Sequence, residues 1–575
     1  MVDLKIKLNE VYSVYLSIVG IFLFSMFLRL EPLIYSPMWG SDYGEYYYLS
    51  SYLISNHHLL LNNYGGWGFG YPYFPGMFVI VSSFTLISGV PLFYSINFLI
   101  PVIDAFAAVT VYLIADRITS SFIASISSAL FITVVMPIVF VTSHSIPSTV
   151  GDFLFITSLY LFIKVDDDER YWLILFIVSI CLIPTDNLST YMFFISALGA
   201  LFISELLIAK KDKKFSWGKV AFLEIYLLFM TTYWFTYAYK FEKKIVGTAF
   251  SIHIGSYMLF IIAGISILAV PLIVKIRREY LPFKMRLHPL SIKKITVRSL
   301  SLFVLVITGV YLLTLVDIPG TTMEVPIASF IFFIPMIIIL SMTLVGSRVM
   351  DFFKYGNYTL GWLTAIVGSA FIGAVTDSPV LMPYRHIEYL LYPAGIFFGA
   401  SVWIIYYNIS FSKKLKLIFV FFIAALLISN AVIDYPPQKI MNGFNESYSY
   451  SDFGAISWMH YNIHGDTIAT DHRLSSVIWG FTGNYATWGD TKALFFSENT
   501  TAILQSLNNT GAPFVKRHVE LVVIDQYIIN GVDINPNAPA LPLKNPKKFM
   551  QSPFVLLYSC NGASIYAVNY QSYMA

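Results

Sequence analysis

The chain has 575 residues, of which 57% are hydrophobic and only 12% charged, and its formal net charge is +3. Soluble globular proteins carry about 25% charged residues, so this composition excludes an ordinary soluble domain and predicts a polytopic membrane protein. The basic residues gather in short loops between apolar runs, and their placement therefore indicates membrane topology and not nucleic-acid binding.

Apolar runs of about 20 residues predict membrane-spanning helices. About thirteen runs qualify, and the fourth and fifth are short enough to form a re-entrant pair, which would leave the orientation of all later spans unchanged. The runs cover residues 11–28, 93–115, 122–142, 153–163, 171–183, 191–209, 217–238, 254–274, 299–316, 327–346, 359–376, 387–407 and 415–433.

The stretch 76–90 decides which loops share a face, because it is apolar but short and lies between prolines and a glycine. If it lies along the membrane as an interfacial or re-entrant helix, the lysines at 210–214, the basic loop 275–298 and the lysines at 413–416 all fall in the cytoplasm. We therefore expect one long first external loop, residues 29–92, a cytoplasmic N-terminus and an integral plasma-membrane protein.

The tail differs in kind from the rest of the chain. Residues 434–575 alternate apolar and polar side chains and are punctuated by Asn, Gly and Pro, which is typical of short strands and turns. We expect a transmembrane domain over residues 1–433 and a small extracytoplasmic α/β domain over residues 434–575.

Three acidic residues interrupt the apolar chain at separate places. Asp42 lies in the first external loop, Asp152 ends the second external connection, and Glu324 lies in the loop after the ninth span. A single loop carboxylate is usually just solvated, but three on one face beside a membrane indicate a site. Carboxylates from separate loops suit a divalent cation, Mg²⁺ or Mn²⁺, which would bind a negatively charged phosphate donor.

Tyr384, Arg385 and His386 open the twelfth span on the same face. A guanidinium can hold a phosphate through two parallel hydrogen bonds, although an arginine at this depth can also reach the lipid headgroups. Glu45 and His144 are possible additional metal ligands, and a solvated interface histidine is the commoner role for the latter.

An acidic run and one further acid are separate from Asp42, Asp152 and Glu324. The acidic run 166–169 resembles a metal site, but the topology places it in the cytoplasm, where a solvated turn accounts for it better. Asp186 faces outside and is a further candidate for the lining of the site.

These features resemble the C-type (GT-C) membrane glycosyltransferases, and within them the catalytic subunit of oligosaccharyltransferase, over nearly the whole chain. That family has thirteen spans, a long first external loop with an acid, a second acidic motif after the third span, a Thr-x-x-Glu loop and an external C-terminal domain. The resemblance implies that Asp42 is a metal-bound acid facing the acceptor and Asp152 a metal ligand. It also implies that Glu324 orients the acceptor or faces the metal, and that Arg385 clamps a lipid diphosphate.

The chain departs from this family in two places. Leu154 stands where a second acid or a histidine is usual, so the metal shell is either thinner or borrows Glu45 or His144. Residues 455–459 are similar to the segment that introduces the family's Trp-Trp-Asp-Tyr-Gly motif, but Thr-Asp-His-Arg follows at 470–473 and that motif is missing. Transfer to Asn-x-Ser/Thr sequons is therefore not supported.

We expect a membrane glycosyltransferase that moves a sugar or glycan from a polyprenyl phosphate or diphosphate donor to a protein or lipid-linked glycan acceptor on the outer face. Leu154 and the missing motif favour the alternative of a non-catalytic GT-C-like subunit or lipid-binding assembly protein. A secondary transporter is a weaker alternative, because it would show inverted repeats and acids at mid-membrane, whereas Asp42, Asp152 and Glu324 are expected in loops.

Overall fold

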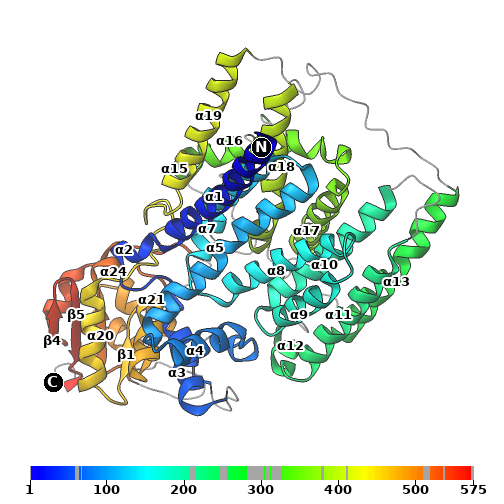
Figure 1. The fold of residues 1–575 in the computed structure, drawn as a ribbon. Coiled ribbons are helices and arrows are strands. Elements are labelled where there is room, and N and C mark those ends of the chain that lie inside the picture. The colour runs from blue at the N-terminus through cyan, green and yellow to red at the C-terminus, as the bar shows by residue number, and fades with distance from the viewer. Residues whose placement is uncertain are drawn as a thin grey trace.

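The computed structural model describes residues 2–58, 64–66, 68–207, 215–245, 256–280, 327–376, 381, 383–408, 412–508, 518–534 and 538–571, with the isolated residues 304, 308 and 311. Figure 1 shows a large helical bundle with the strands and α20, α21 and α24 gathered at one end, next to α3 and α4. The N-terminus lies toward the opposite end of the bundle. The ninth expected span and Glu324 lie outside the described residues, apart from the three isolated positions.

The described chain contains seven helices long and apolar enough to cross a membrane, or eight if one bent pair is a single span. These helices confirm the polytopic α-helical class. The seven lie within α1 Val2–Leu30, α5 Leu92–Thr119, α10 Asn187–Leu207, α13 Ser256–Tyr280, α17 Gly356–Thr376, η4 Pro383–His386 with α18 Ile387–Asn408, and α19 Lys413–Val432.

The bent pair is α6 Phe122–Val134 and α7 Met136–Thr142, which meet at 58°. Val135 is extended and a proline stands in the first turn of α7, so the helical hydrogen bonding is interrupted there. The other helices are α2 Pro32–Tyr35, α3 Tyr43–Asn56, η1 Tyr71–Tyr73, α4 Gly76–Ser88, α8 Pro147–Lys164, α9 Tyr171–Leu182, α11 Trp217–Phe235, α12 Tyr239–Ile245, α15 Ile327–Phe332, α16 Ile334–Ser347 and η3 Met350–Phe352.

Helix α4 corresponds to the stretch that decides the topology. It has 13 residues and ends at Gly89 with φ 73°, a left-handed conformation that favours glycine. At ~1.5 Å per residue a helix of this length falls short of a ~30 Å hydrocarbon core. Its length therefore agrees with an interfacial position.

Helix α8 starts earlier than the sequence pattern indicates, and this corrects the expected position of Asp152. The helix begins at Pro147, so Asp152 lies in its second turn and is fully buried, and is not a loop residue. Proline is well suited to the first turn, because the missing N–H has no helical partner there. A Cβ on Gly151 would lie 2.3 Å from Ser189 Oγ, so the glycine allows α8 to approach α10 closely.

The acidic run at 166–169 is also more than a solvated turn. Lys219 is fully buried on α11, and its Nζ lies 2.8 Å from Asp166 Oδ2. Asp167 pairs with Arg117 of α5 and accepts a 2.8 Å hydrogen bond from Tyr355. These contacts tie the ends of several helices together, and they account for the acidic residues without a metal.

The tail forms a five-stranded sheet in the order β2-β1-β3-β5-β4. Strands β2, β1 and β3 are parallel, and β3, β5 and β4 are antiparallel. This sheet and its helices confirm the expected small α/β domain. The elements are α20 Tyr450–Asn462, β1 Thr467–Ala469, α21 His472–Thr482, β2 Tyr485–Thr487, η5 Gly489–Thr491, α22 Lys492–Phe496, α23 Thr500–Asn508, β3 Leu521–Ile524, α24 Gln526–Asn530, η6 Pro546–Met550, β4 Phe554–Cys560 and β5 Ala563–Val568.

Residues 29–92, expected from the sequence to be the first external loop and called so below, share one hydrophobic core with the tail. Tyr43 and Phe78 from the loop belong to the same buried cluster as Ile468 and Val477 from the tail. A shared core of this kind holds the two segments in a fixed relation, because each would expose apolar surface without the other. Any site between them is therefore built on a rigid support.

Candidate active site

Asp42 lies immediately before α3, in the first external loop, and its side chain is 29% exposed. Its Oδ2 accepts a 2.6 Å hydrogen bond from Tyr71 and a long, 3.5 Å one from Tyr46. Tyr46 also donates to Tyr71 at 3.0 Å. Burial raises the pKa of both phenols, and the nearby carboxylate adds to the effect, so both stay protonated as donors.

The other oxygen of Asp42 faces the tail. His472 Nε2 lies 3.9 Å from Asp42 Oδ1, and its Nδ1 lies 3.4 Å from Asp533 Oδ2. Burial lowers the pKa of His472, but its contact with Asp533 and the charge of Asp42 outweigh this and raise the pKa to about 9. A protonated imidazole thus stands between two carboxylates.

His472 is placed by the start of α21, directly after β1. Asp471 caps the helix by accepting a 3.0 Å hydrogen bond from Leu474 N. The next side chain, Arg473, is buried against Asp525 and over the ring of Tyr448. These fixed neighbours orient the first turn of α21 toward the first external loop.

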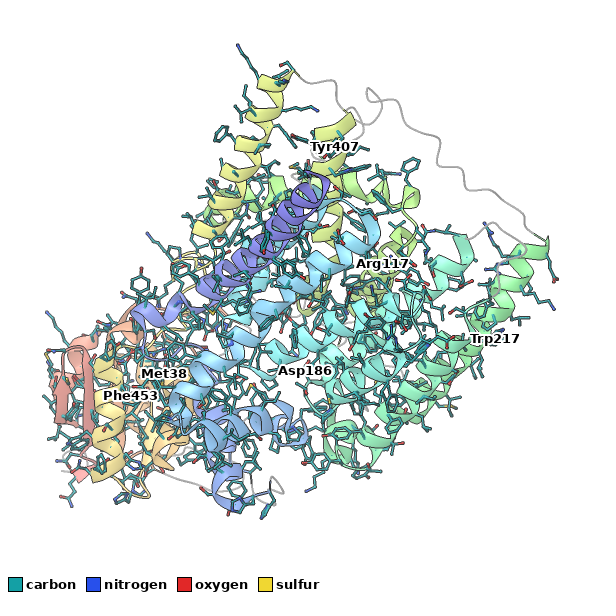
Figure 2. All side chains as sticks on the ribbon, viewed as in Figure 1. Met38, Arg117, Asp186, Trp217, Tyr407 and Phe453 are labelled. Atoms are coloured by element: carbon teal, nitrogen blue, oxygen red, sulfur yellow. The ribbon has the colours of Figure 1, made fainter. Side chains whose placement is uncertain are left out.

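A cavity of about 150 Å³ lies beside Asp42. Tyr46, Tyr71 and Phe74 line it from the first external loop, and residues 146–148 with Asp186 line it from the bundle. Asp186, labelled in Figure 2, lies at the end of the bundle near α4. Two residues before it in the chain, Pro184 O accepts a 2.9 Å hydrogen bond from Gly76 N, the first residue of α4. The cavity therefore lies between the tyrosines that contact Asp42 and Asp186 of the bundle.

Asp152 meets acidic neighbours within the bundle. Its carboxyl faces that of Glu388 on α18, and Asp186 and Asp104 act on it as well. Two ionised carboxyls cannot donate to each other, so Asp152 and Glu388 share a hydrogen bond only when one of them carries a proton. Asp104 itself pairs with Arg29 at 2.8 Å, and both of these side chains are fully buried.

The side chains of the three residues that open the twelfth span point in two different directions. Tyr384 and Arg385 are exposed, the guanidinium lies 6.0 Å from the centre of the Tyr384 ring, and its charge acts on Asp186. His386 instead points into the bundle, where it is fully buried, and its Nε2 lies 2.9 Å from Ser369 Oγ. The first two can reach a substrate, whereas His386 contributes to helix packing.

The two candidate additional ligands are engaged elsewhere. Glu45 is fully buried and accepts hydrogen bonds from Tyr64 and from the backbone N–H of Gly68. His144 Nδ1 lies 2.7 Å from Phe140 O, and its Nε2 lies 3.9 Å from Glu446. Within the described ranges, no group of three His, Cys, Asp or Glu side chains could hold a metal ion.

Sequence reasoning missed Glu388, Asp104 and Arg29 and gave His472 no role. A signal existed for the first three, because an ionisable residue inside or next to an apolar span marks a functional or paired position by default. The signal for His472 was weaker. It required the knowledge that α21 begins beside the first external loop.

No protein-family model and no curated protein matches this sequence. Among solved structures, the chain is similar to the Archaeoglobus fulgidus oligosaccharyltransferase tethered to an acceptor peptide with the NVT sequon. The match has 13% identity and a TM-score of 0.57 and covers 98% of this chain and 74% of that chain. The chain therefore has a GT-C-like membrane fold.

Two further similarities are weaker. ArnT from Cupriavidus metallidurans bound to undecaprenyl phosphate has 9% identity and a TM-score of 0.39, with 96% of this chain and 98% of that chain covered. The arabinofuranosyltransferase AftD from Mycobacteria has 11% identity and a TM-score of 0.41, with 96% and 40% covered. Because both scores fall below 0.5, the fold assignment rests on the Archaeoglobus structure.

Proposed function

We propose that this chain is a membrane glycosyltransferase that moves a sugar or glycan from a polyprenyl phosphate or diphosphate to an acceptor on the extracytoplasmic face. The observation that carries the proposal is Asp42, an acid of the first external loop that faces His472 and is held by Tyr71, a residue that lines a cavity. It stands in a GT-C-like fold. In this proposal residues 434–575 are extracytoplasmic, residues 1–433 form the transmembrane domain and the N-terminus is cytoplasmic, in the plasma membrane.

The reaction is a direct displacement at the anomeric carbon. An acceptor oxygen or nitrogen attacks that carbon, the bond to the phosphate oxygen breaks, and the phosphate leaves with the electron pair. Asp42 orients the acceptor and takes its proton, while the hydrogen bond from Tyr71 keeps the carboxylate in place. Arg385, which is exposed and whose charge acts on Asp186, binds the phosphate, with Tyr384 beside it.

A divalent cation, Mg²⁺ or Mn²⁺, is part of this proposal. Asp152 and Glu388 place two buried carboxyls together, and a cation could take the place of the proton that such a pair would share. Asp152 and Asp42 would hold it. Such an ion would neutralise charge on the departing phosphate. Glu324, outside the described residues, stays a candidate for the same site.

The test is turnover of a radiolabelled polyprenyl diphosphate sugar by the purified chain in lipid nanodiscs. Asp42→Asn should reduce turnover at least ~100-fold, the usual loss when a general base is removed. Asp168→Asn is the matched control, because that carboxylate pairs with exposed Arg170 in the run expected to be cytoplasmic. Full activity of Asp42→Asn would remove the proposal.

A second candidate is a non-catalytic lipid-binding protein with the same fold. The contact of Asp152 with Glu388, together with Leu154, favours it, because the expected metal shell is then incomplete in the described chain. This candidate predicts that wild-type protein binds the lipid phosphate but never consumes it.

A further inference from the structure

A second, larger cavity lies between the first external loop and the edge of the sheet. It measures about 370 Å³, and Gly65 and Gly66 form one wall. Residues 485–490, which are β2 and the turn after it, form the other wall. This volume falls within the ~300–1,000 Å³ range of small-ligand sites. In this segment Thr487 O accepts a 3.1 Å hydrogen bond from Thr470 N, which follows β1.

The lining combines aromatic rings with one acid. Tyr485 and Trp488 supply the rings, and Asp490 supplies an exposed carboxylate. A sugar ring has an apolar face that packs on an aromatic ring and hydroxyl groups that donate to a carboxylate. On the facing wall, a Cβ on Gly66 would lie 2.5 Å from the ring of Tyr64, so the chain approaches that ring closely at a residue without a side chain.

The cavity shares a wall with the candidate active site. The ring of Trp488 meets that of His472 edge-on, with their centres 5.0 Å apart. His472 in turn lies 3.9 Å from Asp42. A ligand packed on Trp488 would therefore reach toward the carboxylate that is proposed to accept the proton.

Glu45 fixes the glycine wall. Its carboxylate accepts hydrogen bonds from Tyr64 and from Gly68 N, on either side of Gly66. A Cβ on Gly68 would lie 2.5 Å from Glu45 Oε2, so the loop approaches the acid closely at a residue without a side chain. A buried acid that holds the loop from within gives the cavity a fixed shape.

We propose that this cavity, defined by residues 65–66 and 485–490, binds a carbohydrate acceptor. The proposal rests on the proposed function and names its acceptor class. In the reaction, a sugar hydroxyl oxygen attacks the anomeric carbon of the donor and forms a glycosidic bond. The bond to phosphate breaks with its electron pair on the phosphate, and the hydroxyl proton passes to Asp42.

A carbohydrate fits this site better than a peptide. The tail lacks the family's Trp-Trp-Asp-Tyr-Gly motif, and Arg473 in the corresponding segment is buried against Asp525. The aromatic rings and the carboxylate of the cavity instead match the two faces of a sugar. A peptide acceptor is therefore the competing outcome of the experiment.

The experiment measures acceptor binding to the full chain in nanodiscs by saturation-transfer NMR. The probes are methyl mannoside, N,N′-diacetylchitobiose and a peptide containing Asn-Ala-Thr. At least one sugar should bind, and Asp490→Asn and Trp488→Leu should each weaken it about tenfold, the effect of one charge-assisted hydrogen bond or one packed ring. Lys492→Ala, an exposed residue beyond the cavity, should bind like wild type.

Binding of the peptide alone, or sugar binding that neither Asp490→Asn nor Trp488→Leu weakens, would overturn the proposal. Trp488→Leu can disturb His472, so Asp490→Asn is the decisive variant. Donor consumption is followed in the same samples. No donor consumption by wild type in the presence of the sugars or the peptide would contradict the proposed function, whereas donor consumption without sugar binding would contradict only the acceptor class.

Discussion

Gly44 and Gly480 lie against each other where α3 crosses α21. A Cβ on Gly480 would lie 2.1 Å from the carbonyl oxygen of Gly44, and a Cβ on Gly44 would lie 1.9 Å from Ser476 O. This crossing sets how closely the first external loop and the tail approach. It therefore determines the distance between Asp42 at the start of α3 and His472 at the start of α21.

The first prediction concerns this crossing. Gly480→Ala should separate the two helices, because the new Cβ meets backbone that cannot rotate away. We expect unfolding at a temperature several degrees lower and a strong loss of turnover, both measured on purified protein. Gly368→Ala is the control, since a Cβ there meets nothing within 4 Å. Equal stability of the two variants would show that the crossing tolerates a side chain.

The second prediction concerns the hydrogen bonds to Asp42. Tyr71→Phe removes the 2.6 Å bond to Asp42 and should lower turnover about tenfold. Tyr46→Phe removes a 3.5 Å contact with Asp42 and the 3.0 Å bond to Tyr71, but leaves the Tyr71 bond to Asp42 in place, and should have a smaller effect. The measurement is the rate constant kcat at saturating donor. A larger effect of Tyr46→Phe would contradict the geometry.

The third prediction is a dependence of stability on pH. Arg473 is surrounded by buried acids, and burial raises the pKa of Asp471 to about 7 and that of Asp452 to about 6. Both values lie above the ordinary 3.8. Between about pH 4 and pH 7 the folded chain therefore binds more protons than the unfolded chain, so its stability falls as pH rises through this range.

This stabilisation is present in full below about pH 4 and is lost as pH rises through about 7. Thermal unfolding of the purified protein should show a higher midpoint at pH 5 than at pH 8. Asp471→Asn should flatten this dependence, because it removes the titrating carboxyl. An unchanged slope in that variant would assign the effect to other groups.

The fourth prediction concerns the buried pair of Arg29 and Asp104. Breaking it by Asp104→Leu should cost about 3–5 kcal/mol, because the guanidinium is left buried without its partner. The double variant Arg29→Met with Asp104→Leu should recover most of that loss. A double-mutant cycle in urea measures both, and additive losses would show that the pair is not coupled.

Hydropathy and charge placement were enough to predict the helical membrane class, the small α/β tail and the shortness of α4. They were not enough to place Asp152, because the start of α8 depends on Pro147 and on packing through Gly151 against Ser189. The contact between Asp152 and Glu388 joins α8 to α18, which are far apart in sequence. Such a contact comes from tertiary packing and not from any local pattern.

The candidate site was only partly predictable, because some of its contacts also come from tertiary packing. Asp42 stands out in the sequence as an acid in an aromatic external loop, whereas its partners Tyr71 and His472 come from a later turn and from the tail. His386 shows the opposite error. Its position in the sequence groups it with Arg385, yet its ring turns into the bundle toward Ser369.

An experimental structure of the full chain with a bound polyprenyl diphosphate sugar tests the site most directly. The account predicts the diphosphate at Arg385 and the cavity between Tyr71 and Asp186, with the anomeric carbon turned toward Asp42. A headgroup bound away from that cavity, with Asp42 facing only His472, would contradict it.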